Sequence, residues 1–108
     1  MQAHYQKYLK EVLIDEHTLQ TRIAELGARI SQDYHVDDDL LLICILKGGV
    51  MFLTDLTRHI TVPHEIDFMA ASSYGVGART SSGSVRIDMD ITATVEGRHL
   101  LIIEDIID

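Results

Sequence analysis

The sequence predicts an α/β fold, in which a mostly parallel sheet is flanked by helices. Two uninterrupted apolar runs, residues 40–46 and 100–103, are typical of strands that are buried on both faces, as in parallel sheets. Segments with helical periodicity precede and follow the first run, as crossovers between parallel strands require. A later segment alternates apolar and charged residues, which adds one antiparallel excursion to the prediction.

The first half of the chain contains three predicted elements. Residues 11–14, EVLI, are a short possible strand. Asp15 is placed to cap a helix over residues 16–34, because apolar residues recur there at helical spacing. The acidic residues 37–39 predict a solvated turn that leads into the strand over residues 40–46.

The second half continues the alternation. We expect a helix over residues 50–60 and a strand over residues 65–71. Gly and Ser dominate residues 72–84, which predicts a flexible loop or a long hairpin. Residues 85–91 alternate strictly and should form a half-exposed strand. A turn with Gly97 at its bend then leads into the last strand.

Length, charge and composition limit the possible functions. A chain of 108 residues, 46% of them apolar, can form one small domain. The net charge of −8 argues against a general nucleic-acid or anionic-membrane surface. The only cysteine, Cys44, lies in an apolar strand, where we expect a buried thiol. The chain starts without a secretory signal and has no apolar run long enough to span a membrane, so we expect a cytoplasmic protein.

Polar motifs follow three of the predicted strands, at the carboxyl ends where ligands bind in open α/β sheets. Lys47 and two glycines follow the first, SSYG (residues 72–75) the second, and an acidic cluster the last. Backbone N–H groups of Gly48 and Gly49 can approach an anion closely, and a helix N-terminus comes next. These residues fit a plain strand-to-helix turn equally well.

The acidic cluster follows the last strand directly. Glu104 and Asp105 adjoin each other, which is costly unless a cation or hydrogen-bond donors face them. Mg²⁺ or the hydroxyls of a sugar would meet this need. Asp108 can point to the same space, or it can cap a following helix. We favour a binding site over a solvated turn, because a solvated turn would not need the apolar Ile106 and Ile107.

Four stretches, LLLICILKGG, ASSYG, SSGSVRI and EGRHLLIIEDIID, resemble the bacterial hypoxanthine (and guanine) phosphoribosyltransferases in sequence and order. The resemblance runs from about residue 11 to residue 108, and the acidic stretch is its most specific part. It implies a type I phosphoribosyltransferase-like fold. It also implies transfer of the 5-phosphoribosyl group from phosphoribosyl pyrophosphate to hypoxanthine or guanine, giving IMP or GMP and pyrophosphate.

The resemblance implies roles for single residues in the acidic cluster. Glu104 and Asp105 are expected to hold the ribose hydroxyls and Mg²⁺, the implied cofactor. Asp108 is expected to act as the general base near N7 of the purine. Since the transition state carries positive charge on the ribose, nearby carboxylates would stabilise it.

The resemblance assigns the other two motifs as well. Lys47 and Gly48 are expected to bind pyrophosphate, with a cis peptide bond between Leu46 and Lys47. Ser73 and Tyr74 are expected at the tip of a mobile loop that closes over the reacting centre.

The resemblance also has limits. The family's phosphate loop and purine-binding segment would follow Asp108, so we expect residues 1–108 to be one domain, incomplete at its C-terminus and inactive alone. The implied partners are the two small-molecule substrates and further copies of the chain, in a dimer or tetramer. Nucleic acid and membranes are not expected as partners.

Two other functions were weighed against this one. RNA-binding transcription regulators share the fold, but the net charge of −8 and the lack of a basic face argue against RNA. Receiver domains also gather acids at strand ends. Their acidic pair follows the first strand, whereas here the acids come last and the strand over residues 65–71 has no Asp at its end.

Overall fold

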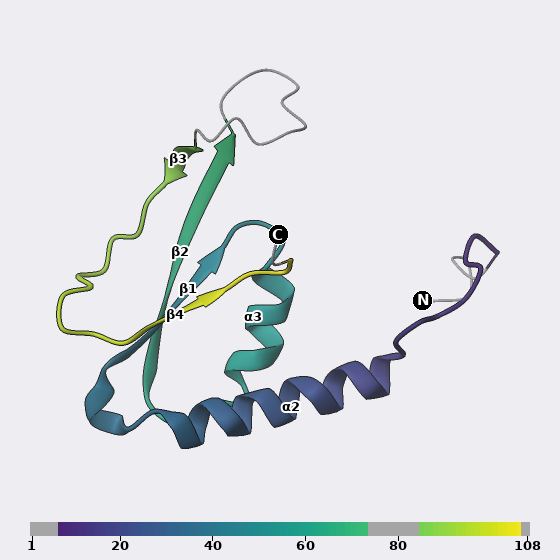
Figure 1. Ribbon diagram of the computed structural model, residues 1–108, viewed down its shortest axis with the longest axis horizontal. Helices are drawn as coiled ribbons and strands as arrows, with labels where there is room; N and C mark the ends of the chain where they lie inside the picture. Colours follow the sequence, from purple (N-terminus) through teal and green to yellow (C-terminus); the bar gives the residue numbers. More distant parts are fainter. Residues whose placement is uncertain (1–6, 74–84, 107–108) are drawn as a thin grey trace.

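The computed structural model describes residues 7–73 and 85–106 and confirms the α/β prediction within them. Four strands form one sheet in the order β3-β2-β1-β4. The inner strands are β1 (Leu40–Ile45) and β2 (His64–Ser73), and the edge strands are β3 (Val85–Met89) and β4 (Leu100–Ile103). β1 pairs in parallel with β2 and β4, and β3 pairs antiparallel with β2 (Figure 1).

The long helix α2 (Glu16–Asp33) begins where the sequence predicts. The Asp15 carboxylate accepts a hydrogen bond from the backbone N–H of Thr18 at 2.8 Å, which confirms the cap. This bond holds the pKa of Asp15 below its usual value. The predicted acidic turn is a short 3-10 helix, η1 (Val36–Asp38).

The hydrophobic core lies between the sheet and the two helices, α2 and α3 (Val50–Thr57). Alternate residues of β1 point into it, together with one residue of β4 and apolar residues of the helices. The chief members are Ile23, Ile30, Leu40, Leu42, Cys44, Leu53, Leu56 and Ile103. The thiol of Cys44 is buried, as predicted, and burial raises its pKa.

The predicted strand over residues 11–14 is wrong. Its apolar side chains are exposed, and the segment continues past the N-terminal end of α2, away from the sheet (Figure 1). A strand needs a neighbour to take up its backbone hydrogen bonds, and no described strand reaches this segment. A short apolar run in the sequence does not show whether such a neighbouring strand is present.

Three elements are more exposed than their sequences indicate. On α2, the predicted apolar stripe is only partly covered: Ile23 and Ile30 are buried, whereas Leu19 and Leu26 are exposed. In β3 all five residues are exposed. In β4 only Ile103 is buried, because β4 has a neighbouring strand on one side alone among the residues described.

The outer part of β2 and β3 form an arm, defined here as residues 70–73 with Val85–Met89. β2 pairs with β1 only up to Met69 and with β3 from Ala70 onward, so the arm extends beyond the part of the sheet that the helices cover (Figure 1). The arm explains why the alternating pattern of β3 has no buried face. The flexible loop or hairpin was predicted over residues 72–84. Its first two residues, Ser72 and Ser73, instead form the end of β2, because they pair with β3, and residues 74–84 lie outside the described residues.

Candidate functional site

The carboxyl ends of β1 and β4 place two of the predicted motifs side by side. The strands are parallel and adjacent, with Cys44 opposite Ile103 at the end of the shared register. The turn at residues 47–49 follows β1, and the acidic pair at residues 104–105 follows β4. Both motifs therefore lie at one edge of the sheet.

Gly48 lies directly against Asp105. A Cβ atom on Gly48 would overlap the Asp105 carboxylate, so the backbone of the turn comes this close only because residue 48 has no side chain. A Cβ on Gly49 would lie 3.1 Å from the backbone oxygens of both Ile45 and Ile103. The two glycines thus let the turn pack against the end of β4.

The turn itself has the geometry that the resemblance implies. The peptide bond between Leu46 and Lys47 is cis, which confirms that expectation. The N–H of Leu46 donates to the carbonyl of Met69 at 2.8 Å, and that of Gly49 to Ile45 at 3.2 Å. The side chain of Lys47 is exposed, and α3 begins at Val50, so the turn places a cation beside the positive end of a helix dipole.

The acidic pair is partly organised by its own backbone. The Glu104 carboxylate accepts a hydrogen bond from the N–H of Asp105 at 2.9 Å, and Glu104 is half-buried while Asp105 is exposed. The negative charge of Glu104 adds to burial in raising the pKa of the nearby Cys44 thiol. Cys44 is therefore a packing residue beneath the turn rather than a reactive thiolate.

The acidic pair fits a magnesium ion that arrives with a phosphorylated substrate. Within residues 7–73 and 85–106, no cluster of three or more His, Cys, Asp or Glu side chains is present that would form a complete metal site. Mg²⁺ is commonly held by one or two carboxylates, with waters and substrate phosphates as its other ligands. Glu104 and Asp105 supply that number of carboxylates.

The third motif lies farther out. Ser73 is the last residue of β2 and pairs with Val85, four positions beyond Met69, where the pairing with β1 ends. At the rise of a strand this places it about 13 Å beyond the end of β1. The structure therefore puts Ser73 on the arm. Tyr74 and Asp108 lie outside the described residues.

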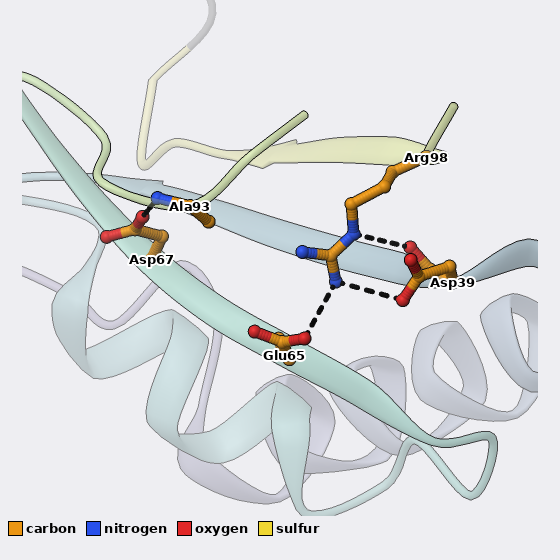
Figure 2. A network of polar contacts seen from close by, with 5 residues as sticks. All are labelled: Asp39, Glu65, Asp67, Ala93 and Arg98. Atoms are coloured by element: carbon orange, nitrogen blue, oxygen red, sulfur yellow. Dashed lines mark hydrogen bonds and ion pairs between the residues drawn. The ribbon is translucent and has the colours of Figure 1, made fainter. Parts of the chain in front are cut away.

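Two polar contacts were not predicted. The carboxylate of Asp67 binds backbone N–H groups of Thr92 and Ala93, and the guanidinium of Arg98 binds Asp39 and Glu65. Figure 2 shows the contact of Asp67 with Ala93 and both contacts of Arg98. One signal in the sequence pointed to the first contact: Asp67 is the single charged residue in an otherwise apolar strand segment, IDFMA (residues 66–70). Its partners are 25 and 26 residues away, so no local pattern identifies them.

Comparisons with known proteins agree with this description. Residues 13–108 match the model of the phosphoribosyl transferase domain. The chain is 49% identical over 105 residues to a hypoxanthine-guanine phosphoribosyltransferase of Mycobacterium tuberculosis, covering 93% of this chain and 52% of that protein. It is 45% identical over 104 residues to a hypoxanthine phosphoribosyltransferase of Haemophilus influenzae, covering 94% and 58%.

A solved structure gives the same result. A hypoxanthine phosphoribosyltransferase from Staphylococcus aureus superposes with a TM-score of 0.85 at 39% identity, covering 94% of this chain and 54% of that one. The chain thus spans about half the length of the relatives it matches. The part of the chain that the structure describes contains no helix long and apolar enough to cross a membrane.

Fold and site define an α/β protein with a Lys-Gly-Gly turn and an acidic pair at the carboxyl edge of a parallel sheet. The chain belongs to the phosphoribosyl transferase domain family.

Proposed function

We propose that the protein acts in purine salvage and transfers the 5-phosphoribosyl group of phosphoribosyl pyrophosphate to hypoxanthine, guanine or both. The observation that carries the proposal is the contact between Gly48 and the Asp105 carboxylate. It brings an anion-binding type of turn and a pair of carboxylates together, which suits a substrate with both a pyrophosphate and a sugar diol. Relatives at 45–49% identity bear the names of hypoxanthine and hypoxanthine-guanine phosphoribosyltransferases.

In this proposal the turn binds the leaving group. The backbone N–H groups around Gly48 and the charge of Lys47 face the pyrophosphate, and the N-terminal end of α3 adds a favourable partial charge. Glu104 and Asp105 hold the ribose hydroxyls, and their negative charges stabilise the positive charge that develops on the sugar. Bound Mg²⁺, held by the same pair, would neutralise charge on the departing pyrophosphate.

The remaining roles fall on residues at or beyond the limits of the described chain. Asp108 accepts the proton of the purine as general base. Ser73 and Tyr74 belong to the loop that closes over the reacting sugar and excludes water. The arm supports this last role, because Ser73 ends β2 at its outer end and all five residues of β3 are exposed.

We further propose that residues 1–108 belong to a single phosphoribosyltransferase domain, and that the protein is cytoplasmic and forms a homodimer or homotetramer. Sedimentation equilibrium of the full-length protein measures the assembly. A concentration-independent monomer mass would contradict this part of the proposal.

The test of the function is a direct assay of the full-length protein. Phosphoribosyl pyrophosphate and Mg²⁺ are supplied with hypoxanthine, guanine or adenine, and nucleotide products are separated by chromatography. We expect IMP or GMP and one equivalent of pyrophosphate, with no product from adenine and none after chelation of Mg²⁺. Failure to form either nucleotide would refute the proposal.

A further inference from the structure

The connection between β3 and β4 crosses the sheet. These strands lie at opposite edges in the order β3-β2-β1-β4, and residues 90–99 join them. Figure 1 shows the connection running back along β2 before it reaches β4. It links the arm, which carries the predicted loop, to the strand that carries the acidic pair. Its placement therefore affects both halves of the proposed site.

Asp67 holds the connection at its first point. One carboxylate oxygen accepts the backbone N–H groups of Thr92 and Ala93, each at 2.9 Å, and the other accepts the N–H of Phe68 at 2.8 Å. The bond from Ala93, followed by those from Phe68 and Thr92, holds the pKa of Asp67 below its usual value. The carboxylate is therefore ionised at neutral pH and occupied by backbone donors on both oxygens.

Arg98 holds the connection at its second point. Its side chain is only 9% exposed, and its guanidinium donates to the backbone oxygen of Asp39 at 3.1 Å. The same group lies 3.2 Å from the carboxylates of both Asp39 and Glu65 (Figure 2). The guanidinium is nearly buried, whereas the carboxylates of Asp39 and Glu65 are 64% and 67% exposed. The attachment therefore depends on the hydrogen-bond geometry of the guanidinium as well as on opposite charge.

Both attachments lie on the face of the sheet that the helices leave open. Glu65 and Asp67 are two positions apart on β2, so they share a face, and they pair with Leu41 and Ile43 of β1. Leu41 and Ile43 are buried yet are not members of the core cluster between sheet and helices. Glu65 and Asp67 thus lie beside Leu41 and Ile43, on the face of the sheet opposite the core cluster.

The second attachment leads straight into the candidate site. His99 follows Arg98, and its carbonyl accepts the N–H of Leu41 at 2.9 Å, which starts the pairing of β4 with β1. From there β4 runs without interruption to Glu104. A shift of β4 along β1 would move the acidic pair away from Gly48, because strand residues are about 3.3 Å apart.

We propose that Asp67 and Arg98 are positioning residues, which fix the connection on β2 and thereby hold the acidic pair against the Gly48 turn. This inference rests on the proposed function for its kinetic consequence. Neither residue touches the substrate. Arg98 acts by fixing how β4 pairs with β1, and Asp67 acts by holding the connection against β2 where it leaves the arm.

The test compares Asp67→Ala and Arg98→Ala with the control Asp37→Ala in the full-length protein. Asp37 is a suitable control, because its carboxylate is 88% exposed and lies near His35 within the same turn. We expect kcat/KM per folded molecule to fall on the order of 10- to 100-fold in the first two variants, the usual effect of misplacing reacting groups. The control should match the wild type.

Hydrogen exchange gives a second readout that does not depend on turnover. In Asp67→Ala the amides of Thr92, Ala93 and β4 should exchange faster, while those of β1 and α3 stay protected. Asp67→Asn keeps one acceptor oxygen and should restore part of both the protection and kcat/KM. It also serves as the test variant if the alanine variant does not fold.

The outcomes separate this inference from the function on which it rests. A lower melting temperature with wild-type kcat/KM would mean that the attachments only stabilise the fold, and would overturn the inference. Unchanged exchange of the β4 amides would overturn it as well. If the wild type itself forms no nucleotide, the proposed function fails, and exchange at β4 alone then decides whether Asp67 and Arg98 fix the strand.

Discussion

β1 and β4 are neighbouring strands with equally apolar sequences, but they differ in burial. In β1 every residue from Leu40 to Cys44 is buried. In β4 only Ile103 is buried, and Leu100 and Ile102 are 42% and 66% exposed. β1 lies between two strands under the helices, whereas β4 has one neighbouring strand within residues 7–73 and 85–106. The difference shows that the position of a strand in the sheet, rather than its amino-acid composition, decides how much of its apolar surface is buried in the core.

Substitutions in or after the two strands should therefore have different effects. β1 contributes three residues to the core cluster, and the turn after it depends on glycines. β4 contributes only Ile103 to that cluster, and the residues that follow it are those proposed to bind the ribose and Mg²⁺. Changes around β1 should alter stability or the shape of the turn, and changes beyond β4 should alter turnover. The predictions below test this division.

The largest effect is expected beyond β4, at Asp108. In the full-length protein Asp108→Asn keeps the size of the side chain but removes the basic oxygen, so kcat should fall by roughly 10²–10⁴-fold. Binding of Mg²⁺-phosphoribosyl pyrophosphate and the melting temperature should change little. Near-normal turnover would reject the general-base role and favour a helix cap, because Asn caps as well as Asp.

Glu104→Gln and Asp105→Asn provide the contrast with Asp108. Because these residues are proposed to hold the ribose and the metal, both kcat and the apparent affinity for phosphoribosyl pyrophosphate should suffer. Steady-state kinetics and titration calorimetry with Mg²⁺-phosphoribosyl pyrophosphate measure the two parameters separately. A loss of kcat at unchanged affinity would place the pair outside the substrate site.

A matched pair of substitutions compares the strands themselves. Leu42→Ala should lower the free energy of unfolding of the 108-residue chain by about 2–5 kcal/mol, because it leaves a cavity in the core. Ile102→Ala should cost less than about 1 kcal/mol, because its side chain is largely exposed. Urea denaturation measures both. Equal losses would show that the open face of β4 is covered in solution.

The next effect concerns the turn after β1. In Gly48→Ala the new methyl group must displace the Asp105 carboxylate, so kcat/KM should fall on the order of 10²-fold with little loss of stability. Gly27→Ala is the control. A Cβ there would overlap His59, away from the site, so it should lower stability and leave kcat/KM per folded molecule unchanged. The reverse pattern would contradict the contact between the turn and β4.

The elements that could be predicted from the sequence are those defined by local patterns. The apolar run of β1, the capped helix α2 and the glycine turn each depend on residues close in sequence. The exposure of β4 and the loss of the strand over residues 11–14 depend on which neighbours are present, and one strand's sequence does not contain that information. The attachments at Asp67 and Arg98 were missed for the same reason, because they span 25 to 59 residues.

The same distinction between local and distant contacts predicts the smallest effect, a difference between two aspartates at low pH. Asp15 and Asp67 both have a pKa below the usual value because backbone N–H groups bind their carboxylates. A depressed pKa in the folded state means that the stabilisation is complete above the unfolded pKa of about 3.9. It is then lost as the pH falls through the lower, folded pKa.

The two asparagine variants separate the local cap from the distant attachment. Asp15 accepts a single backbone bond, which Asn replaces, so Asp15→Asn should keep the melting temperature at pH 7 and only flatten its decline in acid. Asp67 uses both oxygens, and the amide group of Asn would face an N–H donor, so Asp67→Asn should lower the melting temperature already at pH 7. Melting curves of both variants between about pH 2 and pH 7 measure the difference. If the two variants behave alike at pH 7, the bonds from Asp67 to the connection contribute no more than a replaceable helix cap.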